Sequence, residues 1–443
     1  MNRITNLLRT LLCTTLCLAF TTLHSQYAFP LGTKTPYTPG SDTAALPPAG
    51  YTPFFINYVG RHGARHATNT GELIRLDQWL QAAAESNALL PDGIRLQKMV
   101  RAILAVEKKY PSGTLTAVGE TEQYHIGKDM GERYPQVVRQ PNDCLQVIST
   151  PEQRTVQSAD QFLKGLASAS TCITRTPDDS VRLRFFSLSP AYKDFEKKGD
   201  WKKAQAQLES ADPYHAATTA ILHRIFDSAW TVPENFIMSV YAAAVIAPGL
   251  KEELRQAGYK PEDSDIFSLL SPKEAEALAT VESARDFFVK GPGLDAEGIQ
   301  VRVAAPLLAD FIQSTDEWLA TGKSGADLRF AHAETIAPIA ALMGCEGAST
   351  AVTDPFRYPD VWRSDRLIGY SANIQWIFYR KKGSQDDCLL KVLYNERPIH
   401  LPLATTTYPF YSWKDVRAYY LQKLRSIDLL PGHDSYGWLR TLK

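Results

Sequence analysis

Two arginines and two histidines lie within six positions of the chain, at Arg61, His62, Arg65 and His66. A guanidinium offers a fork of N–H donors that matches the oxygens of a phosphate group. A neutral imidazole is a good nucleophile at moderate pH. This stretch therefore predicts a phosphate-handling site and offers a histidine as a candidate nucleophile.

The elements around this stretch would position it well. Residues 54–59, FFINYV, form a short apolar run typical of a strand buried on both faces of a parallel sheet. A helix is expected next, with Asn69 as its cap and Glu72 in capping-box spacing. Ligands of open α/β sheets bind at such strand-to-helix turns, where a helix N-terminus favours anions.

A second strand end carries another arginine. Residues 145–148 predict a strand, and Thr150 is expected to cap the next helix, with Pro151 at its first position. Arg154 then falls in the first turn of that helix. The spacing brings a third guanidinium to the carboxyl end of a strand.

A third strand end carries a histidine and a carboxylate. Residues 328–331 predict a strand, and a helix is expected over 337–344. If the chain between them is extended, His332 and Glu334 point to the same side. Each of the three strand ends therefore supplies a side chain suited to phosphate chemistry.

Four segments together resemble the histidine acid phosphatase branch of the histidine phosphatase superfamily. Residues 61–65 match its RHGxR motif, residues 115–122 its LTxxGExE pattern, and residues 149–159 its STxxxRTxxSA segment. The His-Ala-Glu form at 332–334 resembles the multiple inositol polyphosphate phosphatases within that branch.

The resemblance implies a phosphomonoesterase that acts on inositol polyphosphates through a phosphohistidine, without cofactor or metal ion. His62 is then the nucleophile, and Glu334 donates a proton to the leaving group and later activates water. The phosphate ligands implied are Arg61, Arg65, Arg154 and His332. No role is implied for His66.

Three other functions are compatible with these residues. The first is a broad-specificity acid phosphatase. The second is a metal hydrolase with His62, His66 and His332 as ligands, which the neighbouring arginines disfavour because they repel a cation. The third is an exported phosphate-binding protein without turnover, which the joint presence of His62 and Glu334 disfavours.

Residues 1–25 are typical of a secretory signal peptide. Arg3 and Arg9 accompany the apolar run 7–20, and the segment has no acidic residue. The run is shorter than the roughly 20 residues of a membrane span, and a lipid anchor at Cys17 is the weaker alternative. We therefore expect export to the periplasm or the medium, with no stable membrane insertion.

The charge balance limits the partners. The chain has 48 basic and 48 acidic residues, and loss of Arg3 and Arg9 with the signal peptide leaves 46 against 48. Nucleic-acid-binding proteins are usually strongly basic, so no nucleic-acid partner is expected. The expected partner is a small polyanionic substrate held by local positive charge, and the oligomeric state stays open.

The expected fold is α/β, with a mainly parallel central sheet flanked by helices and an inserted, smaller all-α cap domain. The boundaries follow from the composition: a signal peptide at 1–25, the α/β domain at 26–186 and 294–443, and the cap at 187–293. A β-hairpin is expected from 371–380 and 388–395, and a last helix over 413–430. Four cysteines remain, with pairing left open: Cys144, Cys172, Cys345 and Cys388.

Overall fold

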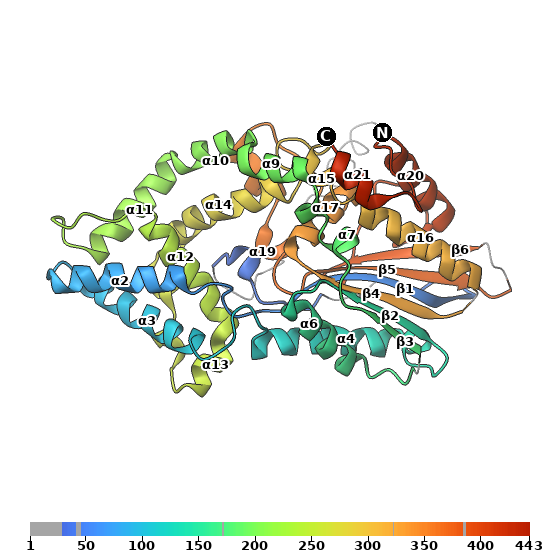
Figure 1. Cartoon of the computed structure of the whole chain (residues 1–443), viewed down its shortest axis with the longest axis horizontal. Coiled ribbons are helices and arrows are strands. Elements are labelled where there is room, and N and C mark those ends of the chain that lie inside the picture. The colour runs from blue at the N-terminus through green and yellow to red at the C-terminus, as the bar shows by residue number, and fades with distance from the viewer. Residues whose placement is uncertain (1–28, 41–45, 171, 322, 384–386) are drawn as a thin grey trace, which may run out of the picture.

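In the computed structural model, which describes residues 29–40, 46–170, 172–321, 323–383 and 387–443, one mixed sheet lies beside a lobe of helices (Figure 1). The expected signal peptide, residues 1–25, lies outside the described residues. Within the described ranges, no helix is long and apolar enough to cross a membrane.

The sheet has the strand order β3-β2-β4-β1-β5-β6-β7, and β8 pairs with β6. Strands β3, β2, β4 and β1 run parallel, whereas β5 to β8 are joined by antiparallel pairing. The strands are β1 Tyr51–Arg61, β2 Cys144–Ser149, β3 Cys172–Thr176, β4 Gly325–Ala331, β5 Asn373–Lys381, β6 Cys388–Tyr394, β7 Arg397–Pro398 and β8 Phe410–Ser412.

Helices cover both faces of the sheet, so β4 is buried throughout and β1 is buried from Phe54 onward. On β1, Ile56 and Tyr58 pack on the face covered by α4 (Ala117–Arg133) and α6 (Gln153–Leu166). Phe55 and Val59 pack on the other face, under α16 (Ala305–Thr321), α17 (Ala333–Met343) and α20 (Trp413–Arg425). The predicted fold class, an α/β sheet flanked by helices with a helical insertion, is confirmed.

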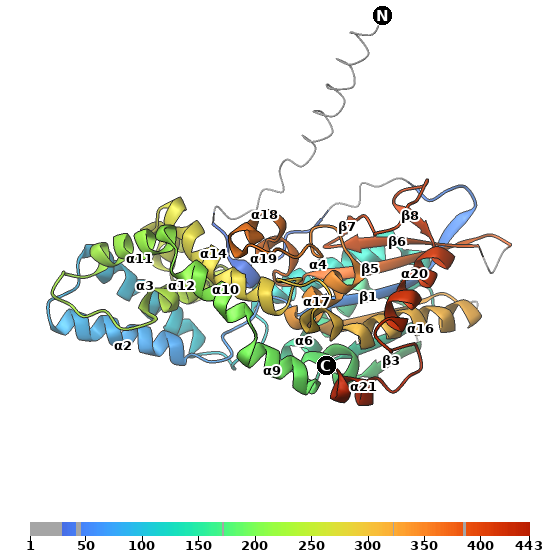
Figure 2. The ribbon, with the colours of Figure 1, turned by 90° about the horizontal axis from the view of Figure 1, so that it is seen from above.

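The helical lobe has a core of its own. This core joins α2 (Gly71–Glu85) and α3 (Pro91–Glu107) to α11 (Asp212–Ile225), α12 (Phe236–Ile246) and the first half of α14 (Pro272–Val289). The lobe thus draws on residues 71–107 as well as on the segment after residue 187. Figure 2 shows it extending away from the sheet.

The remaining helices connect these two parts or lie on the sheet domain. They are the short helices α5 Pro135–Val138, α7 Ser180–Leu183, α8 Phe185–Leu188, α9 Pro190–Lys198, α10 Trp201–Glu209, α13 Lys251–Gln256, α15 Ile299–Arg302, α18 Tyr358–Val361, α19 Ser364–Leu367 and α21 Ser435–Thr441. Single 3₁₀ turns add η1 Gly32–Lys34, η2 Ala247–Leu250, η3 Pro261–Asp263, η4 Ile266–Leu269 and η5 Pro355–Arg357.

Several predicted boundaries were wrong by a few residues. The hairpin of β5 and β6 is confirmed, but the helix expected over 413–430 ends at Arg425. The expected Asn69 cap is also wrong: helix α2 begins after Thr70, without a side-chain cap. Asn69 instead accepts a hydrogen bond from Gly71, 2.7 Å away, and Glu72 turns to Ser239.

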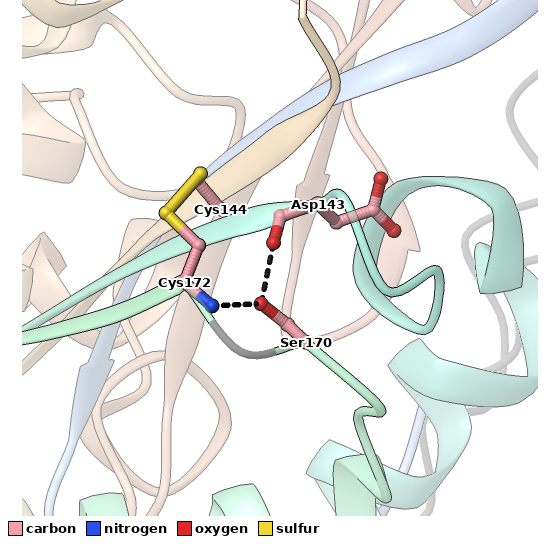
Figure 3. The surroundings of a disulfide bond; sticks show 4 residues. All are labelled: Asp143, Cys144, Ser170 and Cys172. Carbon is pink, nitrogen blue, oxygen red and sulfur yellow. Dashed lines mark hydrogen bonds between the residues drawn. A yellow bond between two sulfur atoms is a disulfide. The ribbon is translucent and has the colours of Figure 1, made fainter.

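One disulfide, Cys144–Cys172, joins the edge strand β3 to β2, where the two residues are paired in register (Figure 3). Next to it, the Ser170 hydroxyl donates to the carbonyl of Asp143 and accepts from the Cys172 backbone N–H. The other two cysteines whose pairing was left open, Cys345 and Cys388, are buried free thiols. The bridge fastens the exposed strand β3 to the sheet.

Candidate active site

The carboxyl ends of β1, β4 and β2 lie side by side, because these three strands are parallel neighbours. Arg61 closes β1, and its side chain is buried. One terminal nitrogen donates to the carbonyls of Thr33 and Ile368, at 2.6 and 2.5 Å. The guanidinium also lies over the ring of Tyr370, 4.8 Å from its centroid. This arginine is therefore fixed before any ligand arrives.

His62 follows Arg61 and is also buried. Its Nδ1 lies 2.9 Å from the carbonyl oxygen of Gly63, which can only accept a hydrogen bond. The proton therefore sits on Nδ1, and Nε2 keeps its lone pair. A main-chain carbonyl thus holds the imidazole from behind.

Helix α4 supports the turn after His62 through backbone contact. A Cβ atom on Gly63 would lie 2.5 Å from the carbonyl oxygen of Gly119, and one on Gly119 would lie 2.0 Å from that of Ala64. Neither position has room for a side chain. The two glycines therefore let the helix start meet the turn directly.

Glu122 and Gln123 of α4 hold the same turn by hydrogen bonds. The buried Glu122 carboxylate accepts from the backbone N–H of Ala64 at 2.9 Å and from the Ser371 hydroxyl at 2.7 Å. Gln123 donates to the carbonyl of Arg61 at 2.9 Å. The LTxxGExE pattern ends at Glu122, so it contains the first of these supporting residues, and Gln123 follows it directly.

Arg154 lies in the first turn of α6, as predicted, and pairs with Glu152 at 3.1 Å. The predicted cap by Thr150 is wrong, because α6 begins at Gln153, after Glu152. The Thr150 hydroxyl is instead 3.0 Å from Nε2 of His332 and 2.9 Å from the Thr155 hydroxyl. This tertiary contact links the ends of β2 and β4.

His332 and Glu334 follow β4, but the chain between them is not extended. Helix α17 begins at Ala333, four residues earlier than predicted, so Pro338 lies inside it. His332 is the residue before the helix, and Glu334 occupies the first turn. The imidazole rings of His332 and His62 lie 5.7 Å apart, centroid to centroid, so the ends of β1 and β4 do meet at one site.

The site keeps both histidines neutral. Burial, followed by Arg61 and Arg65, holds the pKa of His62 well below its ordinary value. Burial is also the main reason why the pKa of His332 falls to about 3, assisted by Arg154. Glu334 opposes this second shift. Since neutral imidazole is the nucleophilic form, His62 is ready to attack.

The three arginines keep hydrogen-bonding capacity for a ligand. The Nε–H donors of Arg61, Arg65 and Arg154 are buried, and in the described part of the chain none of them has a hydrogen-bond partner. An unpaired buried donor is costly, commonly about 1–3 kcal/mol. Three such donors around a neutral imidazole form a site that a tetrahedral oxyanion would complete.

Two lysines at the site were missed by the sequence reasoning. Lys290, just after α14, pairs with Glu334 at 2.9 Å and with Asp286 at 2.8 Å. Lys34, in the 3₁₀ turn η1, has its ammonium 5.8 Å from the ring centroid of Tyr370. Both lie far from the strand-end motifs in sequence, and no local pattern links them to the site.

His66, by contrast, is held in a separate buried pair. Its Nδ1 lies 3.3 Å from the Glu107 carboxylate, and its ring stacks on Tyr110 at 4.4 Å. These contacts give the second histidine of the segment a packing role. Among the residues the structure describes, no group of three His, Cys, Asp or Glu side chains is arranged to hold a metal ion.

Comparison with known proteins shows what this chain is similar to. The profile of the histidine phosphatase superfamily (branch 2) matches residues 55–236, which contain the ends of β1 and β2. The chain is similar to this family over that region. This chain is 23% identical over 396 residues to multiple inositol polyphosphate phosphatase 1 of Gallus gallus. The alignment covers 86% of this chain and 84% of the chicken protein.

Solved structures share the fold of this chain. The multiple inositol polyphosphate phosphatase of Bifidobacterium longum, in complex with inositol hexasulfate, superposes with a TM-score of 0.76 at 20% identity. The match covers 87% of this chain and 96% of that one. The phytase of D. castellii gives a TM-score of 0.64 at 13% identity, over 93% of this chain and 88% of the phytase.

Proposed function

We propose that this protein hydrolyses inositol polyphosphates, including inositol hexakisphosphate, through a phosphohistidine on His62. The observation that carries the proposal is the neutral, oriented His62 among three arginines with unpaired buried donors. This is a site for a phosphoryl group next to a nucleophile. The names of the similar proteins support the inositol polyphosphate as the molecule that carries it.

In the first step, Nε2 of His62 attacks phosphorus in line while the bond from phosphorus to the inositol oxygen breaks. The Nδ1–H, held by the Gly63 carbonyl, keeps the attacking tautomer and stabilises the charge that develops on the ring. Arg61, Arg65, Arg154 and His332 bind the equatorial oxygens, where negative charge spreads in the transition state.

Glu334 completes the reaction at both steps. In protonated form it donates to the leaving inositol oxygen, a strongly basic alkoxide that cannot leave unprotonated at a useful rate. As a carboxylate it then takes a proton from the water that attacks phosphohistidine. Its place in the first turn of α17 leaves 36% of the side-chain surface accessible, so it can reach both groups.

The substrate class fits the local charge. The whole chain is nearly neutral, yet the site gathers Arg61, Arg65, Arg154 and Lys290, with Lys34 beside them, whose pKa is lowered by burial and by the neighbouring cations. A single phosphate monoester would contact only some of these side chains. A ring with several phosphates would also contact the others. We therefore favour an inositol polyphosphate over a general monoester.

The test is phosphate release by the purified protein from inositol hexakisphosphate, compared with β-glycerophosphate, each with and without EDTA. We expect a higher kcat/KM on inositol hexakisphosphate, a mixture of lower phosphate isomers, no effect of the chelator and no activity in His62→Ala. Equal kcat/KM on both substrates would favour a broad-specificity acid phosphatase. Loss of activity in EDTA with recovery in zinc would favour a metal hydrolase.

We further propose that the protein is exported to the periplasm or the medium after removal of residues 1–25. The Cys144–Cys172 disulfide fits this location, because disulfides persist in oxidising compartments. Cell fractionation with N-terminal sequencing is the test. Recovery of the uncleaved chain in the cytoplasm would contradict the proposal.

A further inference from the structure

Lys290 connects the helical lobe to the residue that we assign as proton donor. It follows the last residue of α14, a helix of that lobe, whereas Glu334 lies on α17 of the sheet domain. The ammonium lies 2.9 Å from Glu334 Oε1 and 2.8 Å from Asp286 Oδ1. The side chains of Lys290 and Asp286 are only 11% and 15% exposed, so water screens their contact poorly, whereas Glu334 keeps 36% of its side-chain surface exposed.

This ion pair sets the charge of Glu334 in the free site. Burial alone would raise the pKa of the carboxyl, but the attraction and hydrogen bond of Lys290, with a further contribution from His332, hold it well below its ordinary value. The pKa of Lys290 is raised in return: burial lowers it, and Asp286 and Glu334 more than compensate.

The other charged or titratable groups that interact with Glu334 come from three elements. They are Arg61 at the end of β1, Arg154 on α6 and Tyr192 on α9. Arg61 and Arg154 favour the carboxylate, as Lys290 does. The free enzyme therefore holds Glu334 as a base, whereas the first chemical step requires an acid.

We propose that Lys290 is a positioning residue that couples the protonation of Glu334 to occupation of the phosphate site. In the free enzyme it keeps Glu334 ionised. A bound phosphate group offers its own oxygens to the ammonium, which has three N–H donors, and its negative charge disfavours a second anion nearby. Glu334 then takes up a proton. This inference rests on the role of Glu334 proposed above.

The proton balance over one turnover follows from this exchange. Glu334 gains one proton, from solvent or from a monoanionic ester, when the substrate binds. As the P–O bond to the ring breaks and the P–N bond to His62 forms, that proton passes to the inositol oxygen. Glu334 returns to Lys290 as a carboxylate, which is the form needed to accept a proton from water in the second step. It releases that proton when phosphate leaves the site, so each turnover takes up one proton and releases one.

The test is a ¹³C NMR titration of protein labelled at the glutamate carboxyl carbons, with the Glu334 signal assigned from its loss in Glu334→Gln. In the free wild-type enzyme we expect Glu334 to stay ionised throughout the range in which the protein is folded. With saturating inorganic phosphate, a Glu334 midpoint should appear within that range; each pH unit by which the midpoint rises is a tenfold change in proton affinity.

Variants separate the charge of Lys290 from its packing. In free Lys290→Met a Glu334 midpoint should already lie within that range, and phosphate should have less effect on the protonation of Glu334 than in the wild type. Lys290→Arg keeps the charge and should titrate like the wild type. A matched control is Lys198→Met, which removes the exposed i,i+4 partner of Asp194 and should also change nothing.

Two results would overturn the proposal. One is a wild-type Glu334 that stays ionised throughout the folded range with saturating phosphate as it does without phosphate, a comparison that requires no variant. The other is a folded Lys290→Met enzyme in which Glu334 titrates as in the wild type. Neither measurement depends on turnover of an inositol phosphate, so failure of the coupling and failure of the proposed substrate class give different results.

Discussion

The change Glu334→Gln tests the assignment of the proton donor. Glutamine keeps the size of the side chain but cannot donate an acidic proton. Lys290 retains Asp286 as a partner at 2.8 Å, so the variant leaves no buried cation without an anion. We therefore expect the variant to fold, and its kinetic defect to report the lost proton.

The size of the defect should depend on the leaving group. General acid catalysis typically contributes about 10²–10⁴-fold, equivalent to roughly 3–5.5 kcal/mol of activation free energy. An inositol alkoxide needs all of this contribution. A nitrophenolate is a weak base that leaves unaided. The phosphorylation rate of Glu334→Gln should therefore fall by about 10²–10⁴-fold on inositol hexakisphosphate and by far less on p-nitrophenyl phosphate.

The assay is a rapid-quench burst under single-turnover conditions, because the same carboxylate is proposed to act in dephosphorylation. His62→Ala is the control and should lose the burst equally on both substrates. Equal losses for Glu334→Gln on the two substrates would refute the assignment of Glu334 as the leaving-group acid.

Three further predictions follow from the same contacts. ¹⁵N NMR of the His62 ring should show no protonation as the pH falls from 7 to 5, because burial and the arginines lower its pKa; a midpoint near the ordinary 6.5 would contradict this. Lys34→Met should raise KM for inositol hexakisphosphate by about tenfold and leave that for p-nitrophenyl phosphate within about twofold, because we assign Lys34, whose nitrogen lies 5.8 Å from the ring centroid of Tyr370, to a phosphate other than the reacting one; equal effects on both would place Lys34 at the reacting phosphate. Replacing Cys144 and Cys172 by serine removes a cross-link between residues 28 positions apart and should lower the free energy of unfolding by about 3–4 kcal/mol, with little change in kcat. Chemical denaturation and steady-state kinetics measure the two effects. An unchanged denaturation midpoint would show that the disulfide does not stabilise the fold.

The strand ends and their side chains could be predicted from the sequence because they depend on local signals. Apolar runs, turns and helix starts fixed where His62, Arg154 and His332 would emerge. The predicted caps failed where tertiary contacts outweighed local preference. Thr150 is the clearest case: its hydroxyl bonds to His332 on a neighbouring strand end, so it does not cap α6.

Two other residues of the site, Lys290 and Glu122, could not have been predicted from local signals. Lys290 is 44 positions before Glu334, and their contact exists only because α14 of the lobe ends beside α17. Glu122 is likewise brought to the RHGxR turn by backbone contact between Gly63 and Gly119. Such contacts depend on the packing of whole helices, which a single sequence does not encode as a local pattern.

The most direct test of the account is to trap the phosphorylated enzyme. Denaturing quench during turnover of ³²P-labelled substrate should leave label on the peptide that contains His62. Because the label is a P–N bond on an imidazole, it should survive alkali and be lost in acid. Label that is stable in acid, label on another residue, or an active His62→Ala enzyme would contradict the phosphohistidine mechanism.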